Sequence, residues 1–553
     1  GGPAGRWWVG GTEGRRDNGL TRGSGRLPTM PAFAIKEDDA AALAAAYRSA
    51  VSAATKAGIA ADPEAQITTP LTNLIEQVAA LAGIGELRLI RESQLDGSRP
   101  DFGVLVDKRF CGWIELKKPQ TDISAPETWT GHDGKQWKKL SELDNVLLCN
   151  GREVRWFKNG DQAGHPVALP YDDGEWSASE FAARVELFAH EHVAPITAVS
   201  ALAKRLAPLA RNLRDALYAQ RSNAGAPGHH AACKAHDAWK QMLKEDATEA
   251  EFADAVAQVI TYSLVIAALE GGADSDGDGV LTLGEAKDAL HEHHRLLSAA
   301  LGPILGLEDF MTLIVLEVGA IERLVSGVDV EKIHKRKDPR GEPWLWFYED
   351  FLAAYDPEAR KQAGVYYTPV EVVGCIVRLV EDALVERFDR PLGFGDPGVT
   401  TLDPAAGTGT FPLAVVDSAI ARAVEERGPA GGQMAALSLT ANLFGFELLP
   451  GPYAVTHLRV GQRLASEGVS LPPGGVSVML ADTLASPSIQ KRHGYAAPSP
   501  PGPLTPTRGP VRSSAAGTGC SGTSRDRPGA LSRSAPECSP SRASVRASRA
   551  GPR

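Results

Sequence analysis

The chain has 553 residues, of which 43% are hydrophobic and 23% charged, and its formal net charge is −10 at pH 7. At roughly 100–200 residues per domain, this length excludes a single hydrophobic core and predicts three or four units. No uninterrupted apolar run reaches the roughly 18 residues of a membrane helix, and no signal-peptide pattern is evident, so a membrane or secreted protein is not indicated. The negative charge does not favour a nucleic-acid binder, but local basic surface and bound metal can still provide binding.

The six cysteines are scattered, and no two of them have Cys-x-x-Cys spacing. Neither a disulfide framework nor a zinc ribbon is therefore indicated. A reducing, cytoplasmic location fits this pattern best.

The two ends differ in composition from the middle. Residues 1–29 are rich in Gly and Arg, and Met30 is the first methionine. We expect a disordered, non-native leader over 1–29. From about Pro498 the chain is almost entirely Pro, Ser, Gly, Ala, Thr and Arg, which cannot bury enough apolar surface to fold. We expect a disordered Pro/Ser/Arg-rich tail over 491–553, arising either from a frameshift within a domain or as a natural basic tail that binds nucleic acid.

Three structured parts are expected between these ends, and together they predict the α/β class. Residues 30–175 mix helices with short strands, namely "GELRLI", "FGVLV", "FCGWIEL", "NVLLCN" and "EVRWFKNG". Residues 176–345 repeat the i, i+3, i+4 apolar spacing of helices, as in "EFADAVAQVITYSLVIAALE", and predict a helical connector. Residues 346–490 alternate helices and strands, as a parallel α/β sheet requires.

The stretch "RPDFGVLVDKRFCGWIELKKP" predicts a hairpin that carries three chemically useful side chains. Asp101 opens the first strand, and Glu115 and Lys117 lie two apart on the second, so that both face the same side. Asp101 and Glu115 can supply oxygen ligands to Mg²⁺, while Lys117 can orient a water molecule and offset phosphate charge. Glu76, on the preceding helix "LTNLIEQVAAL", is a candidate fourth member.

This arrangement resembles the PD-(D/E)xK nuclease core, in which a helix carrying Glu precedes such a hairpin. The resemblance implies an Mg²⁺-dependent DNA endonuclease. The later "GKQWKKL" partly resembles the Gln-x-x-x-Tyr element of some members: Gln136 matches, whereas Leu140 stands in place of the tyrosine. Alternatively, the stretch is a surface hairpin with a Glu–Lys pair on one strand face.

The stretch "TLDPAAGTGTF" predicts a strand that ends at Asp403, followed by a glycine loop and a helix. Glycines let a backbone approach a ligand closely, and a helix N-terminus favours negative charge. The loop lacks the Gly-x-Gly-x-x-Gly spacing of dinucleotide sites, because it has Asp403-Pro404 in front of Gly407-Thr408-Gly409.

This loop closely resembles motif I of amino-methylating DNA methyltransferases, and three further stretches agree with that family in order and spacing. "GVYYTPVEVV" looks like motif X, which lines the methionine end of S-adenosylmethionine. "LFGFELLPGPYAV" places an acid for the ribose hydroxyls, and "VSVMLADTL" places an acid for the adenine amino group. The resemblance implies a partial class I methyltransferase sheet whose cofactor residues are Tyr367, Thr368, Pro369, Asp403, Pro404, Ala405, Gly407, Gly409, Glu447 and Asp482. A generic nucleotide-binding sheet is the alternative.

The segment "PWLWFYEDFLAAYDPEARKQAGVYYTP" resembles the one before the methyltransferase in single-chain type IIG and type I restriction–modification enzymes, which fuse a nuclease, a helical connector and an adenine-N6 methyltransferase. The resemblance covers about residues 60–490 and implies double-stranded DNA as the partner. No Walker A loop is present, which favours the type IIG arrangement. The family's (Asn/Asp)-Pro-Pro-Tyr motif, which holds the flipped adenine, is absent after Asp482, so we expect methyl transfer to be lost.

"DSDGDGVLTLGE", residues 274–285, fits the EF-hand loop pattern. The Ca²⁺ ligands would be Asp274, Asp276, Asp278, Val280 and Glu285. An acidic loop between two helices is the alternative interpretation. Two further hypotheses for the whole chain stay open: a calcium-binding, non-enzymatic protein, and an inactive DNA-binding remnant of a methyltransferase. A Pro-Pro-Tyr motif and a recognition domain in another reading frame downstream would favour the fusion enzyme.

Overall fold

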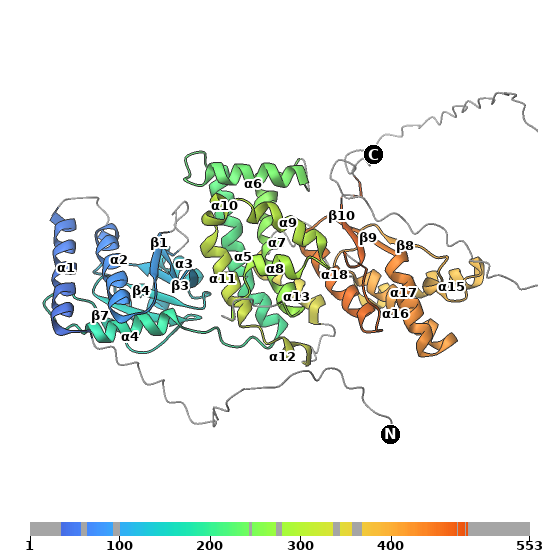
Figure 1. Cartoon of the computed structure of the whole chain (residues 1–553), viewed down its shortest axis with the longest axis horizontal. Coiled ribbons are helices and arrows are strands. Elements are labelled where there is room, and N and C mark those ends of the chain that lie inside the picture. The colour runs from blue at the N-terminus through green and yellow to red at the C-terminus, as the bar shows by residue number, and fades with distance from the viewer. Residues whose placement is uncertain are drawn as a thin grey trace, which may run out of the picture. The chain divides into compact units, whose positions relative to one another are not determined.

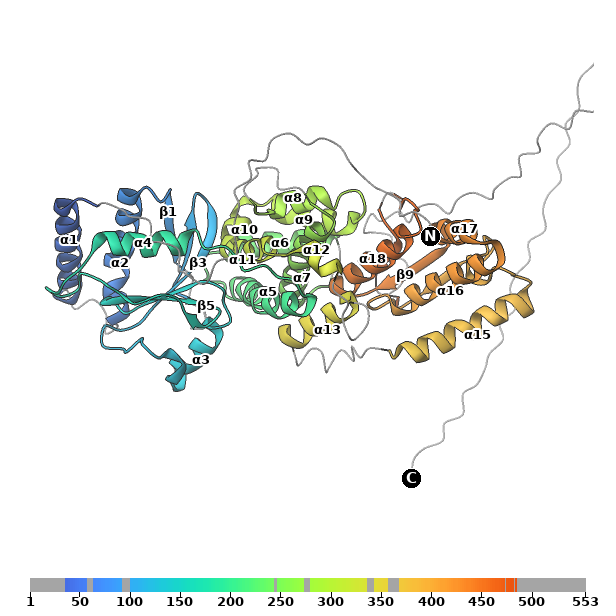
Figure 2. The same ribbon diagram turned by 90° about the horizontal axis from the view of Figure 1, so that it is seen from below.

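The computed structural model describes residues 35–56, 63–91, 100–242, 246–272, 279–335, 343–356, 368–472, 474–481 and 483–484. The expected leader over 1–29 and the expected tail over 491–553 lie outside these residues. The described chain is mixed α/β, as expected, with a sheet near the N-terminus, a helical middle and a small parallel sheet (Figures 1 and 2).

The N-terminal part is a mixed sheet of seven strands. Its order is β1-β2-β3-β4-β5-β6, and β7 pairs with β5. All pairs are antiparallel except the parallel pair β3–β4. The strands are β1 (Leu87–Arg91), β2 (Phe102–Val106), β3 (Arg109–Leu116), β4 (Val146–Cys149), β5 (Glu153–Lys158), β6 (Asp161–Gln162) and β7 (Val167–Ala168). The five strands expected from the sequence are therefore present.

Helices cover this sheet because strands such as "FGVLV" are buried at every position. One core cluster joins side chains of the first helices with side chains of the strands, among them Leu71, Val104 and Phe181. The helices are α1 (Glu37–Lys56), α2 (Pro63–Ala82), α3 (Gly131–Leu140) and α4 (Ala178–Ala189), with a short 3₁₀ turn at Pro126–Thr128.

The middle of the chain is helical. At its centre lies α7 (Glu249–Leu269), which starts at a capping box between Thr248 and Glu251 and is buried along most of its length. In the described part of the chain, α7 alone is long and apolar enough to cross a membrane, and 83% of the relevant window is buried, as in a core helix. The other helices are α5 (Val199–Ser222), α6 (His229–Met242), α8 (Leu283–Ala289), α9 (Arg295–Leu305), α10 (Glu308–Leu313), α11 (Val315–Ser326), α12 (Val330–Lys335) and α13 (Pro343–Tyr355).

The C-terminal part contains a parallel sheet with the order β10-β9-β8. Helices α16 and α17 connect β8 to β9 and helix α18 connects β9 to β10, which are the crossover connections that parallel pairing requires. The elements are α15 (Val370–Phe388), a 3₁₀ turn at Gly393–Gly395, β8 (Thr401–Asp403), α16 (Thr410–Arg427), α17 (Pro429–Asn442), β9 (Leu443–Glu447), α18 (Pro450–Ala465) and β10 (Ser477–Leu480).

The helical middle packs closely against the N-terminal sheet. An ideal Cβ on Gly103 of β2 would lie 2.4 Å from Leu316 of α11, and one on Gly319 would lie 2.6 Å from Phe110 of β3. Arg323 of α11 also pairs with Asp144 at 3.1 Å. One hydrophobic cluster extends from Trp113 of β3 through the connector to Val478 of β10.

Candidate functional sites

The hairpin β2–β3 builds the first candidate site. Its turn residues Asp107 and Lys108 both have positive φ, of 50° and 70°, as a tight two-residue hairpin requires. Asp101 precedes β2, and its Oδ2 accepts a hydrogen bond of 2.7 Å from the backbone amide of Leu116. The hairpin thereby holds the Asp101 carboxylate beside the end of β3.

Glu115 and Lys117 form a buried ion pair. Lys117 Nζ lies 2.8 Å from Glu115 Oε1, and the two residues are only 4% and 1% exposed. Nζ also donates to Gln136 Oε1 of α3 at 2.6 Å and lies 3.4 Å from Asp133 Oδ1. The structure therefore brings Gln136, which the sequence pattern matched, to the same ammonium group.

The pKa values at this site reflect burial and crowded carboxylates. Burial, followed by the charge of Asp101, raises the pKa of Glu115 to about 8, in spite of the nearby Lys117. Burial alone would lower the pKa of Lys117, but Glu115 and Asp133 outweigh it and raise this pKa. A carboxyl group that holds its proton near neutral pH is a site that a cation can occupy by displacing that proton.

The α2 carboxylate next to this centre is Glu64, in the first helical turn. Its charge raises the pKa values of both Glu115 and Lys117. The proposed Glu76 lies twelve residues further along α2, about 18 Å at the rise of an α-helix, and its Oε1 is 3.5 Å from the backbone amide of Leu89. This contact places Glu76 beside β1, and its part in the site stays a prediction. The sequence missed Glu64 because both residues lie on one helix and only packing shows which end reaches the hairpin.

The residues at this centre fit a divalent cation. Oε2 of Glu115 is buried and has no hydrogen-bond partner, so its desolvation is uncompensated in the protein alone. Among the described residues, no three His, Cys, Asp or Glu side chains gather closely enough to hold a metal ion by themselves. Asp101 and Glu115 would therefore supply two protein ligands, and water or phosphate oxygens the others.

The glycine loop after β8 builds the second candidate site. Gly407 and Gly409 have φ values of 55° and 80°, in the left-handed region that favours glycine. Asp403, the last residue of β8, accepts a 3.0 Å hydrogen bond from Ala405 N through Oδ1, while its buried Oδ2 has no partner. Burial raises the pKa of Asp403. This orphaned oxygen is an acceptor that a donor on a ligand would satisfy.

Glu447, at the end of the neighbouring strand β9, faces the same loop. Its Oε2 accepts from Gly407 N and its Oε1 from Leu449 N, both at 2.8 Å. Burial raises its pKa, although these backbone donors oppose the shift. Two acids thus lie at the carboxyl ends of adjacent parallel strands, where ligands of open α/β sheets bind.

The other proposed cofactor residues are placed as follows. Thr368 and Pro369 precede α15, with Pro369 at its N-cap, and Pro404 and Ala405 lie in the glycine loop. Tyr367 and Asp482 lie outside the described residues. The assignment of all these residues to a cofactor stays a prediction.

Of the proposed calcium ligands, Asp274, Asp276 and Asp278 lie outside the described residues, whereas Val280 and Glu285 are described. Glu285 completes a capping box at the start of α8, where its Oε2 accepts from Thr282 N at 2.9 Å and from Thr282 Oγ1 at 2.8 Å. This carboxylate already has a structural role, and calcium binding stays a prediction.

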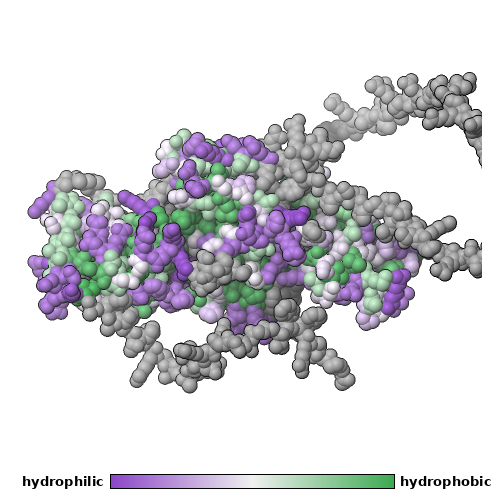
Figure 3. All heavy atoms as spheres, viewed as in Figure 1, coloured by the Kyte–Doolittle hydropathy of each residue, from purple (hydrophilic) through white to green (hydrophobic). Residues whose placement is uncertain are grey.

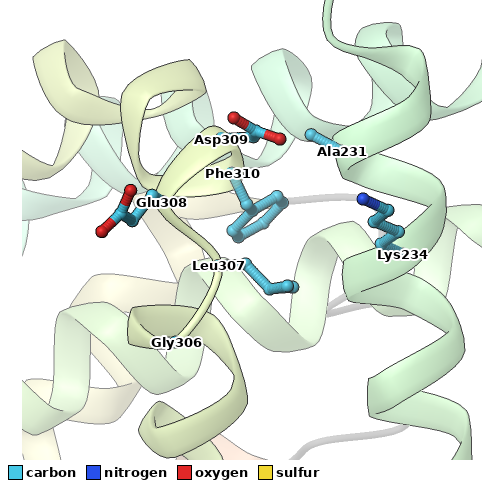
Figure 4. A pocket seen from close by; sticks show the side chains of 7 residues that line it. All are labelled: Ala231, Lys234, Gly306, Leu307, Glu308, Asp309 and Phe310. Carbon is cyan, nitrogen blue, oxygen red and sulfur yellow. The ribbon is translucent and has the colours of Figure 1, made fainter.

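A separate pocket of about 320 Å³ lies in the connector. Phe310 and Leu307 project into it, and Lys234 of α6 lies on the opposite wall (Figure 4). None of its lining residues belongs to either candidate site.

Residues 346–493 match the family model described as N-6 DNA Methylase. This part of the chain is an N-6 DNA methylase domain. The family implies S-adenosylmethionine as the cofactor. The search of curated proteins found no match.

Several solved structures of restriction–modification enzymes are similar to the chain. A DrdV–DNA complex is 20% identical with a TM-score of 0.34, covering 80% of this chain and 40% of that one. The ATP-dependent type ISP enzyme LlaBIII bound to DNA is 15% identical with a TM-score of 0.36, and the match covers 57% of this chain and 20% of LlaBIII. The type IIG restriction endonuclease BpuSI is 13% identical with a TM-score of 0.22, and the match covers 76% of this chain and 42% of BpuSI. The chain therefore spans less than half the length of each of these proteins.

Proposed function

We propose that the chain is part of a restriction–modification enzyme in which a Mg²⁺-dependent DNA endonuclease centre precedes the cofactor-binding half of an adenine-N6 DNA methyltransferase. The match of residues 346–493 to the methylase family carries this proposal. The half-buried Asp403 and the buried Glu447, at adjacent strand ends, support it.

In the methylase domain, S-adenosylmethionine would supply the methyl group. The unpartnered Oδ2 of Asp403 and the carboxylate of Glu447 would accept hydrogen bonds from it, and the glycine loop would allow close approach of the backbone. The 553 residues contain no (Asn/Asp)-Pro-Pro-Tyr motif to hold an adenine amino group. We therefore expect this chain to bind the cofactor without methylating DNA.

In the N-terminal domain, Asp101 and Glu115 would hold Mg²⁺, which acts as a Lewis acid on phosphate and lowers the pKa of bound water. Lys117 would orient the attacking water and offset the charge on the phosphate. Hydrolysis adds water across one phosphodiester bond and leaves one phosphate and one hydroxyl end. The close contacts of Lys117 with Glu115 and Gln136 support this role, because they fix its ammonium group beside the carboxylates.

Isothermal titration with S-adenosylmethionine tests the methylase half. The wild-type chain should bind it, and Asp403→Asn should weaken binding by at least tenfold, about 1.4 kcal/mol, because a buried acceptor is lost. The matched control is Asp382→Asn, an exposed acid on α15, which should bind as the wild type does. Equal affinity of the two variants would remove Asp403 from the site.

Plasmid nicking with Mg²⁺ tests the nuclease half. Lys117→Met keeps the length of the side chain but removes its charge, and should lower the nicking rate at least a hundredfold, about 2.7 kcal/mol. Lys118→Met, at the exposed neighbouring position, should retain activity. Equal rates for both variants, or nicking unaffected by EDTA, would contradict the assignment.

A further inference from the structure

Helix α18 is buried on nearly every side over its first three turns. All twelve residues from Pro450 to Gly461 are buried. A helix at the surface of a domain leaves one face to water, so burial all round means that packing layers lie on both sides. In two views, α18 lies between two groups of elements (Figures 1 and 2). On one side are α7 of the connector and α13, which spans the start of the methylase match, and on the other are α16 and β9.

On the methylase side, α18 holds the glycine loop by its carbonyl groups. Thr456 Oγ1 donates to Gly407 O at 2.7 Å, and the Arg459 guanidinium donates to Thr408 O. Thr456 is fully buried. An ideal Cβ on Gly409 would lie 3.0 Å from Thr456 Cγ2, so the loop rests directly on this side chain. Two successive loop carbonyls are thereby fixed, and because each peptide group is planar, so are the directions of the amides of Thr408 and Gly409.

On the connector side, α18 is held at Gly451. An ideal Cβ there would lie 2.6 Å from Gln258 Oε1 of α7 and 3.0 Å from the rings of Tyr262 and Tyr348. Tyr348 belongs to α13, and burial together with the charge of Glu447 raises its pKa. Helix α7 of the connector therefore reaches the start of α18, and α13, at the beginning of the methylase match, reaches both that start and the neighbourhood of Glu447.

We propose that α18 clamps the glycine loop in its cofactor-binding conformation, that Thr456 is a positioning residue for S-adenosylmethionine, and that α7 and α13 hold the clamp in place. The proposal rests on the proposed function, because the ligand is the cofactor inferred there. A loop that is already ordered loses less conformational entropy when a ligand binds. The clamp therefore raises the affinity for S-adenosylmethionine. The clamp makes the connector part of the cofactor site, although the connector supplies none of the proposed cofactor ligands.

Titration of the full chain with S-adenosylmethionine tests the role of Thr456. Thr456→Val keeps the shape but removes the hydroxyl, and should weaken binding about tenfold. Thr456→Ser restores the donor and should return affinity to within about threefold of the wild type. Thr440→Val is the matched control, because it also removes a hydroxyl that donates to a carbonyl, Leu437 O, but on α17. Wild-type affinity in Thr456→Val would overturn the proposal.

Two glycine variants test the connector's part in the clamp. Gly451→Ala places a methyl group against α7 and α13 and should weaken binding about tenfold. Gly461→Ala, on the same helix, meets only the flexible end of Leu471 at 3.2 Å and should bind as the wild type does. Circular dichroism is the check that both variants are folded. Equal affinity of folded Gly451→Ala and Gly461→Ala would overturn the connector's role.

Hydrogen exchange separates failure of the clamp from failure of the cofactor assignment. Without ligand, the amides of Gly407 and Gly409 should exchange at least tenfold faster in Thr456→Val than in the wild type. If the wild-type chain does not bind S-adenosylmethionine, the proposed cofactor is wrong, and exchange alone decides whether the clamp exists. Unchanged exchange in Thr456→Val overturns the clamp in either case.

Discussion

At the scale of single residues, the first candidate site combines features that the sequence could and could not predict. The two-residue spacing of Glu115 and Lys117 predicted that they share a face, and they form an ion pair of 2.8 Å. The choice between Glu64 and Glu76 was not predictable, because it depends on how α2 packs on the sheet. The partners Asp133 and Gln136 come from α3, sixteen and nineteen residues after Lys117, and only Gln136 gave a sequence signal.

The raised pKa of Glu115 predicts a pH-dependent affinity for Mg²⁺. Because the metal must displace a proton from this carboxyl group, affinity should rise about tenfold per pH unit below pH 8 and level off above it. Glu115→Gln should bind Mg²⁺ at least tenfold more weakly and lose this pH dependence. Isothermal titration from pH 6 to pH 9, in buffers with different ionisation enthalpies, measures both the affinity and the released proton. A wild-type affinity that is flat over this range would contradict the prediction.

The carboxyl group of Glu115 should also change the free energy of unfolding when no metal is bound. Its folded-state pKa of about 8 exceeds the ordinary 4.5, so the native state retains a proton that the unfolded chain releases. This contribution to stability is full below pH 4.5 and is lost as the pH rises through 8. Urea unfolding in EDTA should show Glu115→Gln gaining stability relative to the wild type between pH 5 and pH 8.5. A constant difference between the two proteins across that range would exclude the effect.

At the scale of elements, local pattern predicted the strands well and the packing of the helices poorly. The strands "FGVLV" and "FCGWIEL" and the turn between them lie where expected, because short apolar runs and turn chemistry are local properties. The acids Asp403 and Glu447 likewise end their strands as expected. The burial of α18 on both sides was not predictable, since the partners α7 and α13 lie up to about 200 residues earlier in the chain.

The contact between α11 and the hairpin should be sensitive to one methyl group. Gly319→Ala would place a Cβ 2.6 Å from Phe110 and should destabilise the protein by about 1–3 kcal/mol through overpacking. Gly302→Ala, in helix α9, meets nothing within 4 Å and should be neutral or stabilise by up to about 1 kcal/mol. Chemical denaturation followed by tryptophan fluorescence compares them. Equal denaturation midpoints for Gly319→Ala and Gly302→Ala would show that α11 and β3 do not pack as described.

At the scale of the whole molecule, the methylase part exposes apolar surface around its sheet edge. Helix α15 exposes Val372, Ile376 and Leu379 along one stripe, at 47%, 44% and 63%. Leu402 on β8 is 53% exposed, and among the described strands β8 pairs only with β9. Figure 3 shows apolar, green surface in this part of the molecule. Exposed parallel strand edges and apolar stripes promote association between chains.

Replacing part of this stripe should reduce aggregation. The double variant Ile376→Lys, Leu379→Glu should raise the monomer fraction at least twofold, measured by size-exclusion chromatography with light scattering. Val373→Glu on the buried side of α15 is the contrasting variant and should lower the yield of folded protein. An unchanged monomer fraction in the double variant would show that this stripe does not promote association between chains.

The double-sided burial of α18 also bears on how such chains can be recombined. A boundary drawn at residue 345 follows the change in sequence pattern, yet it separates α7 from α18, which pack so closely that an ideal Cβ on Gly451 would lie 3.0 Å from the ring of Tyr262. A methylase half grafted onto an unrelated connector would expose the apolar first turns of α18. Successful exchange between related genes should therefore keep residues 249–465 together. The unit that related genes can exchange therefore begins before the methylase domain of residues 346–493 and includes α7 of the connector.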